Sequence, residues 1–161
     1  MLYPIRDRDS NRNMEKEMNK FSRNSQEQVN SCHPDLQIIL NHSIGLCPVD
    51  FGVSEGHRSI ELQQKYFKEG KSKIDGVTKM GKHNYYPSLA ADIFPYVNGK
   101  ADYSPETVTF VTAFIAGVAA ILLEKGEISH GLRWGGNWDM DGEILTDQTF
   151  DDRPHIELVN L

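Results

Sequence analysis

The segment from Thr107 to Leu123, TVTFVTAFIAGVAAILL, carries no charged side chain and is close to the shortest length that spans a membrane. It restricts the chain to two kinds of fold: a membrane-anchored protein, or a domain with one long apolar helix in its core. Three threonines lie within the segment, Gly117 lies near its centre, and the acids Glu106 and Glu124 flank it. These residues favour a core helix, so we expect no stable membrane insertion. A membrane-anchored interaction protein is the alternative.

Capping signals and short apolar runs divide the rest of the chain into helices and strands. The predicted helices begin at Pro34, after Ser59 and at Pro105, and they end near Gly45, Gly70 and Gly126. The predicted strands lie in VDFGVSEG, LAADIFPYV, LRWGGNW and HIELV, and we expect the second to close at Pro95. This order predicts an α+β fold, with a small antiparallel sheet flanked by helices.

Length and composition indicate one folded unit. A chain of 161 residues can bury a single core, and we expect a polar N-terminal arm at residues 1–25 and one domain at residues 26–161. The net charge of -6 argues against nucleic acid as a partner. The N-terminus lacks the apolar run of a signal peptide, and two cysteines are too few for a disulfide framework. We therefore expect a cytoplasmic protein with free Cys32 and Cys47; one bridge between them is the alternative.

Histidine and aspartate side chains in two separate stretches offer a catalytic metal site. A catalytic zinc ion needs three protein ligands and an open position for water, and His83, Asp92 and His155 provide such a set. In HIELV, the two-residue period of a strand turns His155 to the face opposite the apolar residues. Asp152 lies three residues earlier, where Pro154 restricts the chain, and it is the candidate general base.

Residue types alone leave a second interpretation open. The interval from His83 to Asp92 matches no short zinc motif. A surface histidine, a capping aspartate and a hydrogen-bonded strand histidine would leave the same pattern. Both interpretations are compatible with these residues taken by themselves.

Four stretches together resemble a known family: EGHRS, GKHNYYPSLAADIFPYVNGKADY, LRWGGNWDMDGE and DRPHIELV, in this order within residues 25–161. They resemble the zinc peptidases that include D-alanyl-D-alanine carboxypeptidases and L-alanyl-D-glutamate endopeptidases, and they are most similar to the phage endolysins among them. The resemblance implies a Hedgehog/DD-peptidase-like zinc peptidase fold. It also implies one zinc ion bound by His83, Asp92 and His155, with Asp152 as the general base.

The sequence departs from this family's first ligand motif at two positions. The motif reads Ser-x-His-x-x-Gly-x-Ala-x-Asp, whereas Gly81 and Ser88 stand here at its serine and its glycine. The interval from His83 to Asp92 is also two residues longer, which we attribute to a larger turn at NYYP. Arg58 matches the arginine of the family's Gly-x-Arg-Ser motif. The resemblance makes Arg58 a catalytic residue that binds a substrate carboxylate or holds the cleft in shape.

The function implied by the resemblance is hydrolysis of the L-alanyl-D-glutamate bond in peptidoglycan stem peptides, by a monomeric phage endolysin. Such an enzyme is made in the cytoplasm of the infected bacterium, and it reaches the cell wall after a separate protein permeabilises the membrane. A D-alanyl-D-alanine carboxypeptidase or dipeptidase of the same fold is one alternative. A non-catalytic wall-binding module is another.

Aromatic and acidic residues outside the ligand set suggest two further roles. Trp134 and Trp138 could form a wall of the substrate cleft, and Tyr85 with Tyr86 could form a lid over it; ordinary packing is the alternative for each pair. NWDMDG places Asn137, Asp139 and Asp141 at the first three ligand positions of a calcium loop. The twelfth position is Gln148 in place of glutamate, so a solvated acidic turn is the alternative to a calcium site.

Overall fold

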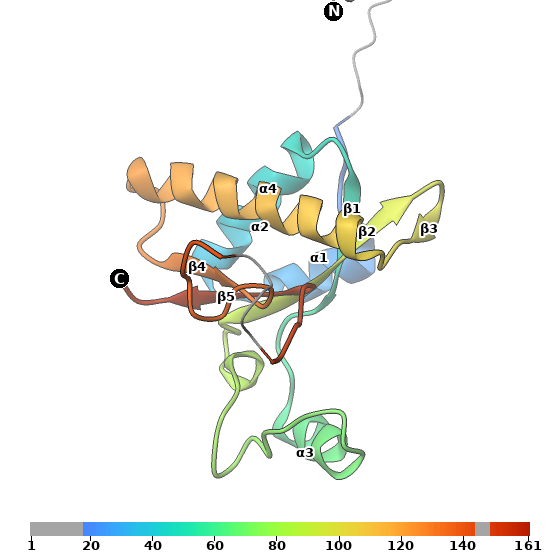
Figure 1. Ribbon diagram of the computed structural model, residues 1–161, viewed down its shortest axis with the longest axis vertical. Helices are drawn as coiled ribbons and strands as arrows, with labels where there is room; N and C mark the ends of the chain where they lie inside the picture. Colours follow the sequence, from blue (N-terminus) through green and yellow to red (C-terminus); the bar gives the residue numbers. More distant parts are fainter. Residues whose placement is uncertain (1–17, 144–148) are drawn as a thin grey trace, which may run out of the picture.

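A five-stranded antiparallel sheet forms the centre of the computed structural model, which describes residues 18–143 and 149–161 (Figure 1). Its strands pair in the order β1-β2-β5-β4, and β3 pairs with β2. The strands are β1 (Asp50–Glu55), β2 (Ala90–Val97), β3 (Lys100–Ala101), β4 (Gly131–Trp134) and β5 (His155–Val159). The helices are α1 (Arg23–Asn30), α2 (Pro34–Leu46), α3 (Ile60–Lys68) and α4 (Pro105–Glu124), with a short 3-10 turn η1 (Lys82–Asn84). The predicted α+β fold with a small antiparallel sheet is confirmed.

The hydrophobic core lies between one face of the sheet and the helices α2 and α4. Alternate residues of the strands point into it, among them Ile93 of β2 and Ile156 and Leu158 of β5, each almost fully buried. Residues 91 and 93 of β2 therefore face the helices, while residue 92 faces the other way. In Figure 1, α3 and the segment after it project as a separate lobe on the side of the sheet opposite α4.

The apolar segment from Thr107 to Leu123 lies within α4. One side of this helix is buried in the core through Val111, Ile115 and Leu122, as predicted for a core helix, while Phe110 and Ile121 on its other side are about half exposed. By length and composition α4 also qualifies as a membrane span, and a third of its most apolar window is buried. Its packing against the sheet and α2 gives the segment a structural role within the domain.

The capping signals place the predicted helix ends correctly, whereas one predicted strand end differs. Ser59 caps α3 through its hydroxyl, and Gly70 and Gly126 adopt positive φ after α3 and α4. The end expected near Gly45 lies at Leu46. The expected end of the second strand at Pro95 is wrong. β2 runs on to Val97, since Pro95 needs only its carbonyl there, which accepts the backbone N–H of Asp102.

Residues that precede the first helix contribute to the packing of the domain. Phe21 contacts Phe51 of β1 edge to face, with ring centroids 5.6 Å apart, and Ser22 caps α1. Residues 1–17 lie outside the described residues, so the division into an arm at 1–25 and a domain at 26–161 stays a prediction. Cys32 and Cys47 are both buried, and no disulfide bond joins them in the described part of the chain.

Candidate metal centre

Three side chains from two strands and a 3-10 turn meet at one point of the sheet. His83 Nε2 lies 3.3 Å from Asp92 Oδ1 and 3.2 Å from His155 Nδ1, and the last two atoms lie 3.1 Å apart. Ligands of a tetrahedral zinc ion with bonds of about 2.0–2.1 Å lie about 3.4 Å from each other. The three predicted ligands therefore come together in an arrangement that fits one metal ion of this size.

Strand register explains why these residues meet although they are far apart in the sequence. Asp92 of β2 is directly opposite His155 of β5, so the two side chains share the face of the sheet that points away from the core. His83 reaches them from η1, and the side chain of His83 is almost fully buried. Residues 85–89 connect η1 to β2, and this connection brings His83 to Asp92 and His155.

Each histidine has a second partner that fixes the orientation of its ring. His83 Nδ1 lies 2.7 Å from the carbonyl oxygen of Gly56, so this nitrogen donates and leaves Nε2 free to bind a metal. His155 Nε2 lies 2.9 Å from Glu157 Oε2, which leaves Nδ1 as the ligand atom. With both rings neutral and protonated at these outer nitrogens, His83 Nε2 and His155 Nδ1 would present their lone pairs to a metal ion at the same point.

Glu157 is a site residue that the sequence analysis did not identify. It is 4% exposed and lies opposite Arg133 in the pairing of β4 with β5, and its Oε1 accepts a hydrogen bond of 3.0 Å from Arg133 Nε. The strand period that placed His155 on the cleft face places Glu157 there as well. That period, together with the pairing of β4 and β5, was the available signal.

The charges of the site stabilise one another. Burial tends to raise the pKa of Asp92, but hydrogen bonds from His155 and His83 hold it far below the usual range. Burial likewise tends to lower the pKa of His155, but hydrogen bonds to Asp92 and Glu157 outweigh it and raise this pKa to about 9. Because a metal ion binds the neutral form of histidine, metal binding at this site would compete with a proton on His155.

Asp152 lies beside the three ligands in a tightly held turn. The carbonyl of Asp152 accepts the backbone N–H of His155 at 3.0 Å, and its own N–H donates to Gly135 at 3.0 Å. A side chain at Gly135 would come within 2.1 Å of the carbonyl oxygen of Asp152, so only glycine allows this approach. Burial, and then the charge of Asp92, raise the pKa of the Asp152 carboxyl group. The turn therefore fixes an acid with raised proton affinity next to the metal ligands.

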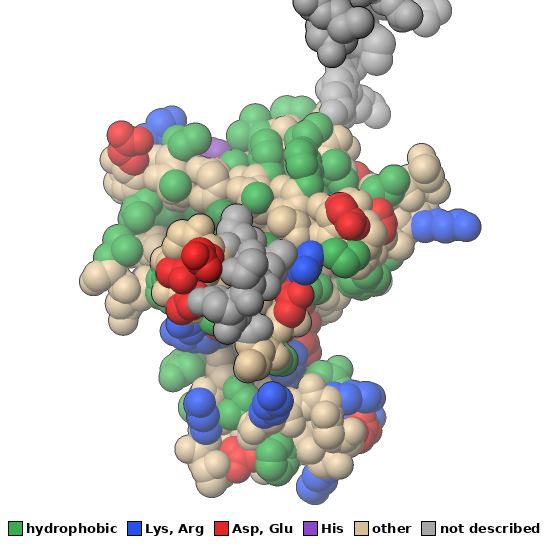
Figure 2. Space-filling model, in the orientation of Figure 1, with side chains coloured by type: hydrophobic (Ala, Val, Ile, Leu, Met, Phe, Trp, Pro, Cys, Tyr) green, Lys and Arg blue, Asp and Glu red, His purple; other side chains and the backbone are tan. Residues whose placement is uncertain are grey.

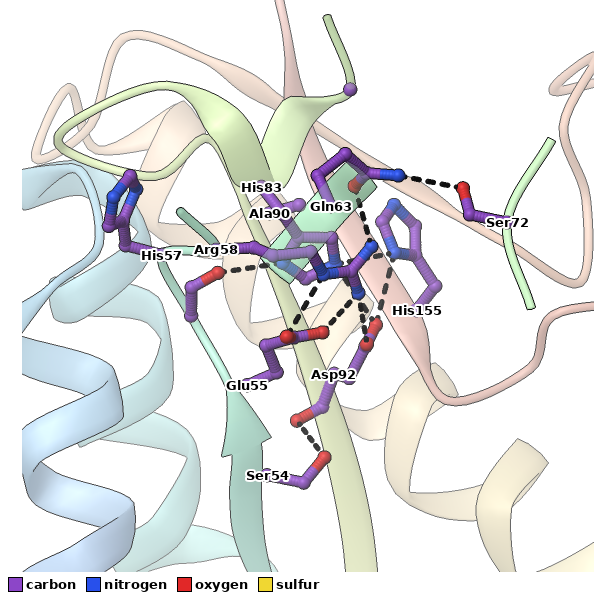
Figure 3. A network of polar contacts seen from close by, with 12 residues as sticks. Ser54, Glu55, His57, Arg58, Gln63, Ser72, His83, Ala90, Asp92 and His155 are labelled. Atoms are coloured by element: carbon purple, nitrogen blue, oxygen red, sulfur yellow. Dashed lines mark hydrogen bonds and ion pairs between the residues drawn. The ribbon is translucent and has the colours of Figure 1, made fainter. Parts of the chain in front are cut away.

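Arg58 lies beside the candidate ligand Asp92 and is bound by other protein groups (Figure 3). Its guanidinium group makes a two-point contact with the carboxylate of Glu55, and its Nη1 donates to Gln63 at 3.0 Å. A bulge at Ser54 turns Glu55 toward the cleft, opposite Asp92. Arg58 Nη2 lies 3.9 Å from Asp92 Oδ2. These contacts hold Arg58 in place beside the ligand Asp92.

The site opens into a cleft of about 850 Å³ between the sheet and the α3 lobe. Arg58, Asp152 and Tyr85 line this cleft, together with all three candidate ligands. Its aromatic wall comes from Trp138 and Phe150, which are stacked with centroids 5.9 Å apart. Trp134 is not among the residues that line it; this side chain packs against the core and donates its indole N–H to the carbonyl of Arg153.

The loop after β4 carries the three candidate calcium ligands. Asn137 Nδ2 donates to the carbonyl of Asp141, while Asn137 Oδ1 is buried without a hydrogen-bond partner in the described part of the chain. Asp139 and Asp141 are exposed. Gln148, at the twelfth position, lies outside the described residues. A calcium site at this loop stays a prediction.

The arrangement as a whole is suited to hydrolysis: a His-Asp-His ligand set, a neighbouring acid and an open cleft. A family model described as phage L-alanyl-D-glutamate peptidase matches residues 18–159. The L-alanyl-D-glutamate peptidase of Escherichia phage T5 is 30% identical over 143 residues, which cover 87% of this chain and 98% of that protein. The crystal structure of the L-Ala D-Glu endopeptidase ChiX from Serratia marcescens matches with a TM-score of 0.69 and 24% sequence identity. The match covers 91% of this chain and 94% of the ChiX chain. This chain belongs to the phage L-alanyl-D-glutamate peptidase family.

Proposed function

We propose that this L-alanyl-D-glutamate peptidase is a zinc endopeptidase whose metal is held by His83, Asp92 and His155. The observation that supports this proposal is the approach of the three ligand atoms to within 3.3 Å of one another, with both histidine rings oriented by second partners. Two nitrogen ligands and one carboxylate form a donor set that zinc accepts in hydrolytic enzymes. Bound zinc supplies a Lewis acid and lowers the pKa of a water molecule.

Asp152 is the proposed general base. Its position on a fixed turn beside the ligands allows it to accept a proton from the attacking water and to deliver that proton to the leaving amine. Burial and the charge of Asp92 raise its pKa, which increases its proton affinity toward that of the groups it has to serve. Its main-chain hydrogen bonds to Gly135 and His155 hold the backbone from which the carboxyl group projects at the cleft.

Arg58 is proposed to hold the cleft in shape. Of the two roles that the resemblance allows, its contacts with Glu55 and Gln63 favour this one, because they occupy donors on all three guanidinium nitrogens. Tyr85, which is 43% exposed at the cleft, is proposed to contact the substrate. Trp134 was predicted to do the same, but its packing gives that role no support, and Trp138 is the better candidate for an aromatic wall.

The finer assignments of fold and biological setting follow from the family. The fold is proposed to be the Hedgehog/DD-peptidase-like zinc peptidase fold, and the protein is proposed to act as a monomer. As a phage endolysin it acts on the host cell wall; we propose that it accumulates in the host cytoplasm and reaches the wall after membrane permeabilisation. Calcium at Asn137, Asp139 and Asp141 is a separate proposal, which calorimetric titration with millimolar calcium tests.

Mass spectrometry of fragments released from purified peptidoglycan tests the proposed function. Zinc-loaded protein should release stem peptides that begin at glutamate, and chelation should abolish this release until zinc is restored. Loss of a single D-alanine would identify a carboxypeptidase instead. A folded, zinc-loaded protein that releases no product would support the wall-binding module.

A further inference from the structure

One wall of the cleft is basic although the protein as a whole is acidic. The segment between α3 and η1 contributes Lys71, Lys73 and Lys79 to the cleft lining, and Lys82 of η1 follows them. Figure 2 shows Lys and Arg side chains gathered on the lobe that α3 and this segment form. We refer to residues 71–82 as the lysine segment. Its charge contrasts with the net charge of -6 for the chain.

Three lysines of this segment, Lys73, Lys79 and Lys82, differ from the other cations of the cleft in having no acidic partner among the described residues. Arg58 is paired with Glu55, and Arg133 is paired with Glu157. Lys71 is paired with Glu69 at 2.7 Å. Within residues 18–143 and 149–161, by contrast, no carboxylate oxygen lies within 4.0 Å of the ammonium groups of Lys73, Lys79 or Lys82, since every ion pair found there has other members. Their charge is available to a ligand.

The lysine segment is fastened to the catalytic site through one buried side chain. Gln63 of α3 is 1% exposed, and its Nε2 donates to Ser72 Oγ at 2.8 Å and to the carbonyl of Ile74 at 2.7 Å. Its Oε1 accepts from Arg58 at 3.0 Å (Figure 3). The one acid in the segment, Asp75, accepts the backbone N–H groups of the turn that follows it. The segment is therefore a defined wall of the site.

Lys73 extends from this wall toward the opposite one. Its Nζ lies 5.4 Å from the ring centroid of Phe150, which is stacked on Trp138. Trp138 in turn lies 5.3 Å, centroid to centroid, from the ligand His155. A peptide bound across the candidate ligands would lie in the cleft that these aromatic rings and the lysines line. The residue next to the cleaved bond is at most about 3.5 Å along the chain from it, so its side chain would lie close to the candidate ligands.

We propose that Lys73, Lys79 and Lys82 form a subsite for the free carboxylate of the D-glutamate residue next to the cleaved bond. A glutamate residue has two carboxyl groups and continuation of the peptide uses one, so this residue keeps a negative charge wherever the other is not amidated. Lysine is a suitable partner because its ammonium group donates in any of three directions. This inference rests on the proposed endopeptidase function. It attributes a preference of the enzyme for acidic stem peptides to these three lysines.

Two synthetic stem peptides, one with the free carboxylate and one with a carboxamide in its place, test this subsite. The combined variant Lys73→Gln/Lys79→Gln/Lys82→Gln should raise KM for the acidic peptide by about tenfold, the sum expected for three solvent-accessible ion pairs, and should change KM for the amidated peptide less than about twofold. The control variant Lys68→Gln/Lys100→Gln/Lys125→Gln removes the same charge outside the cleft lining and should leave both KM values unchanged. Equal zinc content in all three proteins would show that the ligands next to Lys82 are intact.

Equal loss on both peptides, or no loss on either, would overturn the subsite. A loss seen only with intact cell walls would also overturn it, and would assign the lysines to an anionic wall polymer. Dissociation constants of the two peptides, measured in the Asp152→Asn background, give the same comparison without turnover. If the wild-type protein cleaved neither peptide, the proposed function would fail, while these dissociation constants would still decide the subsite.

Discussion

Replacement of Glu157 by glutamine tests the metal site at the residue that orients it. Glu157→Gln keeps the size and the burial of the side chain but removes its charge. Glu157 Oε2 lies 2.9 Å from His155 Nε2, and this contact fixes which nitrogen of His155 faces Asp92 and His83. We expect the variant to bind zinc more weakly because the neutral amide is a poorer acceptor and can present its NH2 group to the ring.

The size of the effect follows from the contact that is lost. A buried hydrogen bond to a charged group contributes about 1.5–3 kcal/mol, and each 1.4 kcal/mol corresponds to about tenfold in a dissociation constant. The zinc dissociation constant should therefore rise by about 10- to 100-fold, the range found when partners of metal-binding histidines are replaced. Arg133 also loses its acidic partner, but its side chain is 33% exposed, so solvent limits that cost.

Competition for zinc against a chromophoric chelator measures this change directly. Glu124→Gln, on the exposed end of α4, removes the same charge far from the site and should bind zinc as the wild type does. Arg133→Gln should retain wild-type affinity, since Glu157 keeps its contact with His155. A Glu157→Gln protein whose zinc dissociation constant stayed within twofold of the wild type would refute the assigned orienting role.

Other predictions concern the base, the ligands and a distant ion pair. Asp152→Asn should keep wild-type zinc affinity and lower kcat by about 100- to 10,000-fold, whereas His83→Ala should lose both zinc and activity; full activity of Asp152→Asn would exclude it as the base. Partial burial tends to raise the pKa of Asp35, but hydrogen bonds from His130 and Ser129 lower it to about 2. Because this pKa lies below the unfolded value of about 3.9, Asp35 stabilises the fold above pH 4 by at most about 2 kcal/mol, and this contribution is lost as the pH falls toward 2. Urea unfolding should show Asp35→Asn to be less stable than the wild type at pH 7, with a smaller difference at pH 3, and equal stabilities at pH 7 would contradict this.

The sequence predicted the parts of the fold that depend on local signals. Helix starts at Pro34 and Pro105 and the cap at Ser59 are short-range effects, and each was confirmed. The alternation in HIELV correctly separated the core face from the site face of β5. The strand end predicted at Pro95 was wrong. Proline interrupts a strand because it lacks an N–H group, but the pairing of Pro95 with Phe51 does not need that N–H group.

Contacts between segments that are distant in the sequence were harder to predict. Nothing local to Asp92 and His155 shows that they pair directly across two strands; residue types and the resemblance suggested the set, and strand register gives its physical cause. The partners Glu55 and Glu157 were missed because each depends on a register or a bulge that only the assembled sheet defines. Trp134 and Trp138 looked equivalent in the sequence, since the turn that sends one to the core and the other to the cleft follows from tertiary packing.

The bulge at Ser54 divides β1 into two regions, in which amino-acid substitutions should have different effects. In a regular strand, Val53 and Glu55 would point to the same side, but the extra residue lets Val53 stay in the core while Glu55 reaches Arg58. Substitutions up to Val53 should then alter the stability of the protein and leave its chemistry intact. Substitutions at Glu55 should instead disturb the site, because they leave the largely buried Arg58 without its acidic partner. The two ends of one short strand therefore face different constraints.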